Sequence, residues 1–185
     1  FEGILDTINN ETKKSFKGQV TMFDITEDEV TQKNKYVFNT QNEFTEKELL
    51  SIKESGKKPK LLLHSCCAPC SSSCIERLIE HFSLTIYFYN PNMDSLEEYT
   101  KRAEEQVKLC SLLGVECIIE DYDKQSFFQC AKGYEKAPEG GARCTNCFNL
   151  RLKKTAEFAL ENGYEYFTTT LTVSPLKDAN KLNAI

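Results

Sequence analysis

The sequence predicts an α/β fold, a doubly wound parallel sheet with helices on both of its faces. From residue 60 onwards, short apolar runs rich in β-branched and aromatic residues alternate with longer segments of helical periodicity. Residues that favour turns separate these segments, among them Asn90-Pro91-Asn92, Gly114 and Asn162-Gly163. Such alternation produces parallel strands, because each crossover helix returns the chain to the same edge of the sheet.

Local patterns place each element in turn. A helix over 95–113 begins at Ser95, an N-cap whose capping box Glu98 completes, and it ends at Gly114. Pro175 suits the first turn of a final helix. Strands are expected at Lys60–His64, 84–89, 115–119 and 166–172, helices at 69–82, 95–113, 123–134 and 144–161, and a glycine-rich loop at 138–142.

Residues 1–56 differ from the rest of the chain, because they are polar and contain no cysteine. Within them we expect a short amphipathic helix at 2–14, a loop or short strand at 18–25 and a helix at 45–55. The run Gly56-Lys57-Lys58-Pro59 then breaks any helix. We therefore expect an N-terminal extension over 1–56 and an α/β domain over 57–185.

Composition and charge narrow the class of protein. The chain is 40% hydrophobic and 28% charged, a globular balance. No apolar run approaches the roughly 20 residues that span a bilayer. The first residues also lack the pattern of a signal peptide, so we expect a cytoplasmic protein with no membrane partner. The net charge of −5 is unlike that of a dedicated nucleic-acid binder, although a local basic patch would still allow an RNA substrate.

The nine cysteines are many for a cytoplasmic chain, and two tight groups among them indicate a metal or redox site. Cys66 and Cys67 lie at a predicted strand-to-helix turn, and Cys144 and Cys147 open a second helix. Helix N-termini stabilise thiolates, and parallel sheets bind ligands at the carboxyl ends of their strands. Four thiolates suit either a structural zinc or an iron–sulfur cluster, and the position at this edge favours a cluster.

The remaining cysteines divide by their surroundings. Cys70 lies one turn beyond the first pair and is a candidate ligand, a ligand to an additional metal ion, or a redox partner. The other four are expected to be buried thiols, because each lies on an apolar helix face or strand: Cys74, Cys110, Cys117 and Cys130.

Three further residues are candidates for substrate binding. His64 ends the first strand and either faces the site or is a structural histidine. Arg143 follows two glycines and either binds phosphate or belongs to a plain loop, and Ser174 lies beyond the last strand. Arg151, with two neighbouring lysines, either contacts an RNA backbone or lies on a solvated helix face.

At these residues the chain resembles the epoxyqueuosine reductase family QueH, from about residue 58 to the last. The matching stretches are 61–70 (LLLHSCCAPC), 89–92 (YNPN), 138–144 (PEGGARC) with Cys147, and 167–175 (FTTTLTVSP). The resemblance implies a Rossmann-like fold of the adenine-nucleotide α-hydrolase type. It also implies reduction of epoxyqueuosine to queuosine in tRNA, the last step of queuosine biosynthesis, by an oxidoreductase whose electron donor is left open.

The resemblance further implies that Cys66, Cys67, Cys144 and Cys147 bind a [4Fe–4S] cluster. An additional iron is expected nearby, with Cys70 as its candidate ligand. The family continues past this point and carries a Cys-Gly-Cys pair near its C-terminus, whereas this chain stops at Ile185. The chain is therefore expected to bind the cluster without completing turnover.

Residues 1–53 do not resemble that family. The stretches 1–9, 18–25 and 42–53 are instead similar to a segment of the bacterial DNA polymerase III alpha subunit. This similarity implies either a fusion or a sequence-assembly artefact, with a leading segment that is poorly ordered.

Two other functions remain open. One is a non-catalytic module of the same fold that four cysteines and a zinc ion stabilise. The other, ranked last, is a nucleotide-binding enzyme, because residues 65–69 (SCCAP) replace the usual glycine-rich phosphate loop.

Overall fold

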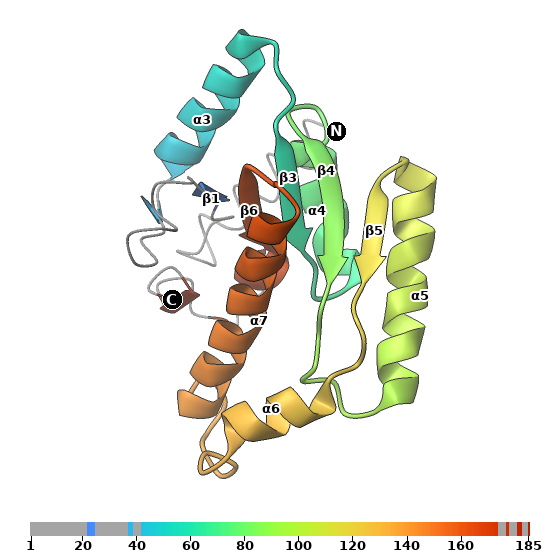
Figure 1. Ribbon diagram of the computed structural model, residues 1–185, viewed down its shortest axis with the longest axis vertical. Helices are drawn as coiled ribbons and strands as arrows, with labels where there is room; N and C mark the ends of the chain where they lie inside the picture. The colour runs from blue at the N-terminus through green and yellow to red at the C-terminus, as the bar shows by residue number, and fades with distance from the viewer. Residues whose placement is uncertain (1–21, 25–36, 39–41, 174–176, 178–180, 183–184) are drawn as a thin grey trace.

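The computed structural model describes residues 22–24, 37–38, 42–173, 177, 181–182 and 185, shown in colour in Figure 1. The strands are β1 (Met22–Asp24), β2 (Val37–Phe38), β3 (Lys60–His64), β4 (Ser83–Phe88), β5 (Glu116–Ile119) and β6 (Tyr166–Thr169). The helices are α3 (Asn42–Ser55), α4 (Ala68–Leu78), α5 (Leu96–Leu113), α6 (Lys124–Ala131), α7 (Ala142–Glu161) and the 3-10 helix η1 (Thr170–Val173).

One sheet with the strand order β2-β1-β6-β3-β4-β5 organises the chain. The four strands β6, β3, β4 and β5 are parallel, which confirms the predicted α/β class with its doubly wound parallel sheet. β1 adds to β6 in the antiparallel direction, and β2 pairs antiparallel with β1. Residues 22–24, where we expected a loop or short strand, are therefore a strand that lies between β2 and β6.

Helices cover both faces of the sheet. The strand β3 requires this cover, because it is apolar at every position from Leu61 to Leu63. Leu61 and Leu63 point into one core cluster, together with residues of α4 and α5. Leu62 points to the opposite face, into a second cluster that includes Ala156 and Ala159 of α7. Successive side chains of a strand alternate between faces, so an unbroken leucine run requires helices on both sides.

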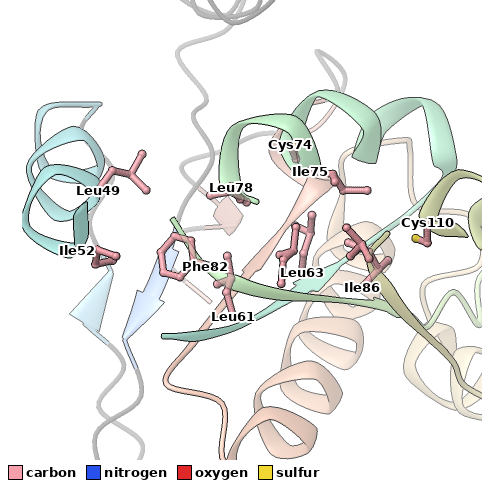
Figure 2. Close-up of a cluster of buried hydrophobic side chains, with 12 residues drawn as sticks. Leu49, Ile52, Leu61, Leu63, Cys74, Ile75, Leu78, Phe82, Ile86 and Cys110 are labelled. Carbon is pink, nitrogen blue, oxygen red and sulfur yellow. The ribbon is translucent and has the colours of Figure 1, made fainter. Parts of the chain in front are cut away.

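The helix α3 packs against the first of these clusters. Figure 2 shows Leu49 and Ile52 of α3 on the side of the cluster where Phe82 and Leu61 lie. The hydroxyl of Tyr166 on β6 also donates a hydrogen bond to Oε1 of Glu48 over 2.9 Å. The second half of α3 therefore shares its core with the α/β domain, while the boundary at residue 56 stays a prediction. The helix expected at 2–14 lies outside the described residues, as does Pro175.

Several elements end earlier than the sequence predicts: α4 ends at Leu78 and not at residue 82, and β4 ends at Phe88 and not at residue 89. The reason is visible for two others. The last strand ends at Thr169, not at residue 172, because the backbone N–H of Leu171 donates to Oγ1 of Thr169 over 3.1 Å and turns the chain into η1. Helix α6 ends at Ala131, shortly before Gly133, whose φ of 84° is incompatible with a right-handed helix. Side-chain bonds and glycine conformations of this kind leave no trace in hydrophobic periodicity.

In the part of the chain that the structure describes, every helix is too short or too polar to cross a bilayer.

Truncating β3 should test how far the fold depends on this strand. Leu63 is fully buried, so Leu63→Ala should lower the free energy of unfolding by about 2–5 kcal/mol through lost burial and the cavity that remains. Urea unfolding followed by circular dichroism measures the change. Leu112→Ala is the control, because Leu112 is 84% exposed and its loss should matter little. Equal effects of the two substitutions would contradict the central place of β3.

Candidate metal centre

The first cysteine group lies in the turn that joins β3 to α4, at the carboxyl edge of the parallel sheet. The backbone N–H of Ser65 donates to the carbonyl of Tyr87 over 2.9 Å, which extends the strand pairing by one residue. Cys67 then adopts an extended backbone and is the N-cap residue of α4, whose first turn contains a proline. The chain therefore leaves the sheet at Cys66 and enters a helix at Ala68, so both neighbouring cysteines lie in the turn.

Three sulfur atoms come together in this turn. Those of Cys66, Cys67 and Cys70 all lie within 4.8 Å of one another, and Cys66 and Cys67 are separated by 3.9 Å between their Sγ atoms. A tetrahedral ion with metal–sulfur bonds of about 2.3 Å holds its sulfurs ~3.8 Å apart. The group thus offers three soft ligands at a spacing suited to one metal ion, and Cys70 belongs to it.

The second cysteine group opens α7 on the other side of the same edge. The backbone N–H of Gly140 donates to Sγ of Cys144 over 3.3 Å, and Cys147 is buried. Cys144 and Cys66 pack against the same apolar cluster, formed by Phe148, Leu152, Leu171 and Leu182. The sulfurs of Cys144 and Cys147 are not part of the compact group of three. A metal shared by both groups therefore stays a prediction.

Hydrogen bonds between the sulfurs set their protonation. The thiols of Cys67 and Cys70 donate to the sulfur of Cys66, which lowers the pKa of Cys66 far below its usual value. The positive charge of Lys177 acts in the same direction. The partnership with Cys66 raises the pKa of Cys67 and of Cys70. One thiolate, held at Cys66 by two neighbouring thiols, is the resting state that this geometry favours.

The cysteines outside the two groups have different surroundings. Burial raises the pKa of Cys74 to about 12, so its side chain stays a thiol in the core, as an apolar residue would. Cys110 is likewise buried in this cluster, as expected. Cys117, which packs against the cluster, and Cys130 are only partly buried.

His64 is fully buried at the end of β3, and both of its ring nitrogens have partners. Nε2 lies 3.1 Å from the carbonyl of Tyr89, and Nδ1 lies 2.8 Å from Oγ1 of Thr169. A carbonyl only accepts, so Nε2 carries the proton and Nδ1 accepts from the threonine hydroxyl. Burial, and then the nearby charge of Arg151, lower the pKa of His64 to about 3. These contacts favour the structural alternative over substrate binding.

The glycine-rich loop before α7 positions Cys144. Gly141 has no room for a side chain, because a Cβ there would lie 2.9 Å from the carbonyl oxygen of Pro138. Nη1 of Arg143 donates to the carbonyl of Glu135 over 3.1 Å, so this side chain is partly engaged within the loop, and its predicted role in phosphate binding stays a prediction. Ser174 lies outside the described residues.

Sequence reasoning missed a buried polar network behind the cysteine turn. Gln106 of α5 accepts from the hydroxyls of Ser65 and Ser71, over 2.7 and 3.0 Å, and donates to Sγ of Cys110 over 3.3 Å. Gln106 shares the buried face of α5 with Tyr99, Ala103 and Cys110. A polar residue at one of the helically spaced buried positions is the sequence feature that could have indicated this network.

Arg151 also differs from expectation. It is buried, not on a solvated helix face, and Nη2 of its guanidinium donates to Oδ1 of Asn90. Nδ2 of Asn90 in turn donates to the carbonyl of Ser65 over 2.9 Å. Arg151 is therefore linked to the cysteine turn through a single side chain.

Comparison with known sequences gives one consistent answer. A sequence model of the family described as Epoxyqueuosine reductase QueH matches residues 61–185. Proteins named Epoxyqueuosine reductase QueH are similar to this chain, at 49% identity over 125 residues in Histophilus somni and 48% over 125 residues in Haemophilus influenzae. A protein of the same name from Staphylococcus epidermidis is 42% identical over 138 residues.

The matched regions cover only part of this chain and only part of each relative. They include 67%, 67% and 70% of this chain and 51%, 51% and 58% of the three relatives, in the order given above. The chain thus spans little more than half the length of these relatives.

Burial of a neutral histidine predicts a dependence of stability on acid. The pKa of His64 is about 3 when folded and near 6.5 when unfolded, so between these values only the unfolded state gains the proton. The free energy of unfolding should fall from about pH 6.5 towards pH 3, with a slope of up to about 1.4 kcal/mol per pH unit from this group. Urea unfolding at a series of pH values measures that slope.

The contribution of His64 is the difference between wild type and His64→Asn, in which that slope should disappear. His81→Gln is the control, because the only other histidine of the chain is partly exposed. Should His64→Asn fail to fold, the ring-proton chemical shift of His64 in the wild type should stay constant from pH 8 to pH 5. A titration of His64 within that range would refute a buried neutral ring.

Proposed function

Because the chain belongs to the epoxyqueuosine reductase QueH family, we propose that it carries the metal-binding part of an enzyme that reduces epoxyqueuosine to queuosine in tRNA. The observation that supports this most directly is the convergence of Cys66, Cys67 and Cys70 at the carboxyl edge of a parallel sheet. That edge is where folds of this class bind their ligands. Proposed with it are tRNA as the partner and the cytoplasm as the location.

The cysteines fit a metal that thiolates bind. Two groups of soft donors lie at helix N-termini, where free backbone N–H groups and the helix dipole favour negative charge. We propose that Cys66, Cys67, Cys144 and Cys147 hold a [4Fe–4S] cluster and that Cys70 contributes to an additional iron. When bound, such a centre supplies electrons and a Lewis acid. Conversion of the epoxide to an alkene consumes two electrons and two protons and releases the oxygen as water.

The protein's own part is to hold this edge rigid. Oγ1 of Thr170 accepts from the backbone N–H of Cys66 over 3.0 Å and donates to its sulfur over 3.3 Å. Phe148, Leu152 and Leu171 pack against Cys66 and Cys144 from the apolar side. Backbone and sulfur of Cys66 are thus both positioned before any metal binds, which lowers the entropy cost of binding.

A second function, a zinc-stabilised module without catalysis, is favoured by one specific distance. The 3.9 Å between the sulfurs of Cys66 and Cys67 is close to the spacing in a site with a single ion. Zinc binds such thiolates without redox chemistry, and its role would be to hold the turn to α4.

Metal analysis of serine variants should separate the two ligand sets. After anaerobic reconstitution with iron and sulfide, the wild-type chain should bind both, and Cys144→Ser should lose most of the bound sulfide. Cys70→Ser should retain the cluster and lose at most the additional iron. Cys117→Ser, on β5, is the control and should resemble the wild type. A colourless wild type with one zinc, no sulfide and a strict need for Cys70 would support the zinc module.

The proposed reaction should be tested with a chain extended to the length of the relatives. Given tRNA that contains epoxyqueuosine and a chemical reductant, the extended chain should form queuosine, measured by mass spectrometry of the digested nucleosides. Cys66→Ser should reduce the rate to background, and Cys117→Ser should leave it within about twofold. No queuosine from a protein with an intact cluster would rule out the proposed reaction.

A further inference from the structure

Arg151 is a buried cation in the middle of α7, one helical turn after Cys147. The residue is 3% exposed. Its guanidinium donates to Oδ1 of Asn90, while its Nε is buried without a hydrogen-bond partner. Burial raises the pKa of Cys147, and the positive charge of Arg151 acts against that rise. The side chain is too deeply buried to reach an RNA backbone from this position.

Among the described residues, no carboxylate forms a salt bridge with Arg151. In that part of the chain, the recorded salt bridges join Arg102 to Glu98 and Lys153 to Glu157, and none involves Arg151. Its neighbour His64 is neutral and has both nitrogens occupied. A buried guanidinium without an anion is costly, and proteins retain one mainly where a negative group comes close.

Thiolates are the negative groups available at this place. Cys147 of the second cysteine group lies one helical turn before Arg151 on the buried side of α7, and the charge of Arg151 favours its thiolate against the burial that raises its pKa. Through Asn90, whose Nδ2 lies 2.9 Å from the carbonyl of Ser65, Arg151 also reaches the turn of the first group. One guanidinium thus connects the β3–α4 turn to the start of α7, the two segments that carry the predicted ligands.

We propose that Arg151 is the positioning residue and counter-charge of the thiolate centre. It holds the two cysteine groups in register through Asn90 and Cys147, and its charge offsets the negative charge that several thiolates bring to one metal. This inference deepens the proposed metal centre and rests on it. It also explains why Nε of Arg151 is buried without a hydrogen-bond partner. A positive group arranged for a metal–thiolate site is incompletely compensated without that site's negative charge.

Cobalt binding to the metal-free wild-type chain tests the inference without any turnover. Co²⁺ alone is the probe, and thiolate-to-cobalt absorption in a competition titration reports its affinity. Arg151→Gln should weaken binding by about tenfold or more, because partners that orient metal ligands contribute about 10- to 100-fold to affinity. Arg151→Lys should recover part of the loss, since lysine keeps the charge but not the planar fork.

Two further measurements separate this role from a structural one. Lys153→Gln is the matched control on the same helix, with a lysine side chain 77% exposed, and it should bind Co²⁺ within twofold of the wild type. In urea, metal-free Arg151→Gln should unfold at the same midpoint as the wild type or a higher one, because it removes a buried charge. Affinity and midpoint would then change independently.

The outcomes are distinguishable. Wild-type protein that binds no Co²⁺ would overturn the metal centre and the inference with it. Normal binding by the wild type and equal binding by Arg151→Gln would overturn the inference alone. A loss of affinity accompanied by an equally marked drop in the urea midpoint would also overturn it, because Arg151 would then support only the fold.

Discussion

The hydrogen bonds at the buried carboxyl end of β3 hold the sheet and the cysteine turn together. His64 joins its two neighbouring strands there, through Thr169 at the end of β6 and the carbonyl of Tyr89 just after β4. Ser65 continues the pairing to Tyr87, and its carbonyl accepts from Asn90. Each of these groups is buried, and each would cost about 1–3 kcal/mol if left unpaired. The strand end is therefore rigid where the first cysteine begins.

That rigidity explains how adjacent cysteines can serve one site. Cys66 and Cys67 would point to opposite faces if β3 continued through them. Thr170 holds the backbone of Cys66, and the serines bonded to Gln106 hold the chain on either side of Cys67. The turn is thus specified from three elements, η1, α5 and β4, while the sulfurs stay partly exposed.

At the carboxyl edge of the sheet, the charges that suit a thiolate site are unfavourable for the stability of the fold. Arg151 and Lys177 bring positive charge towards Cys147, where it acts against the burial that raises the pKa, and Lys177 also favours the thiolate of Cys66. A chain selected for stability alone would place an apolar residue at position 151, facing Asn90. Arg151 is the one charged residue among the buried positions of α7, which are otherwise cysteine, phenylalanine, leucine, threonine and alanine, and this indicates a requirement beyond folding.

Sequence pattern alone predicted the parallel sheet and the place of Cys66 and Cys67 at a strand-to-helix turn, and it left open whether Cys70, one turn beyond, joins them. Alternation of strands and helices specifies parallel strands, and the spacing of three cysteines across a helix start brings their sulfurs to one side of a single turn. Both follow from local geometry with fixed repeats. The ends of elements could not be predicted in this way where a side chain takes the place of a backbone hydrogen-bond partner. The hydroxyl of Thr169, for example, accepts from the backbone N–H of Leu171.

Tertiary structure decided what depends on segments far apart in the chain. Arg151 stands near two lysines in the sequence, and its burial became visible only when Asn90, 61 positions away, faced it. Cys144 and Cys66 meet one apolar cluster only because α7 and η1 return to the edge where β3 ends. Burial and charge compensation depend on which surfaces the fold brings together, and no local repeat in the sequence encodes them.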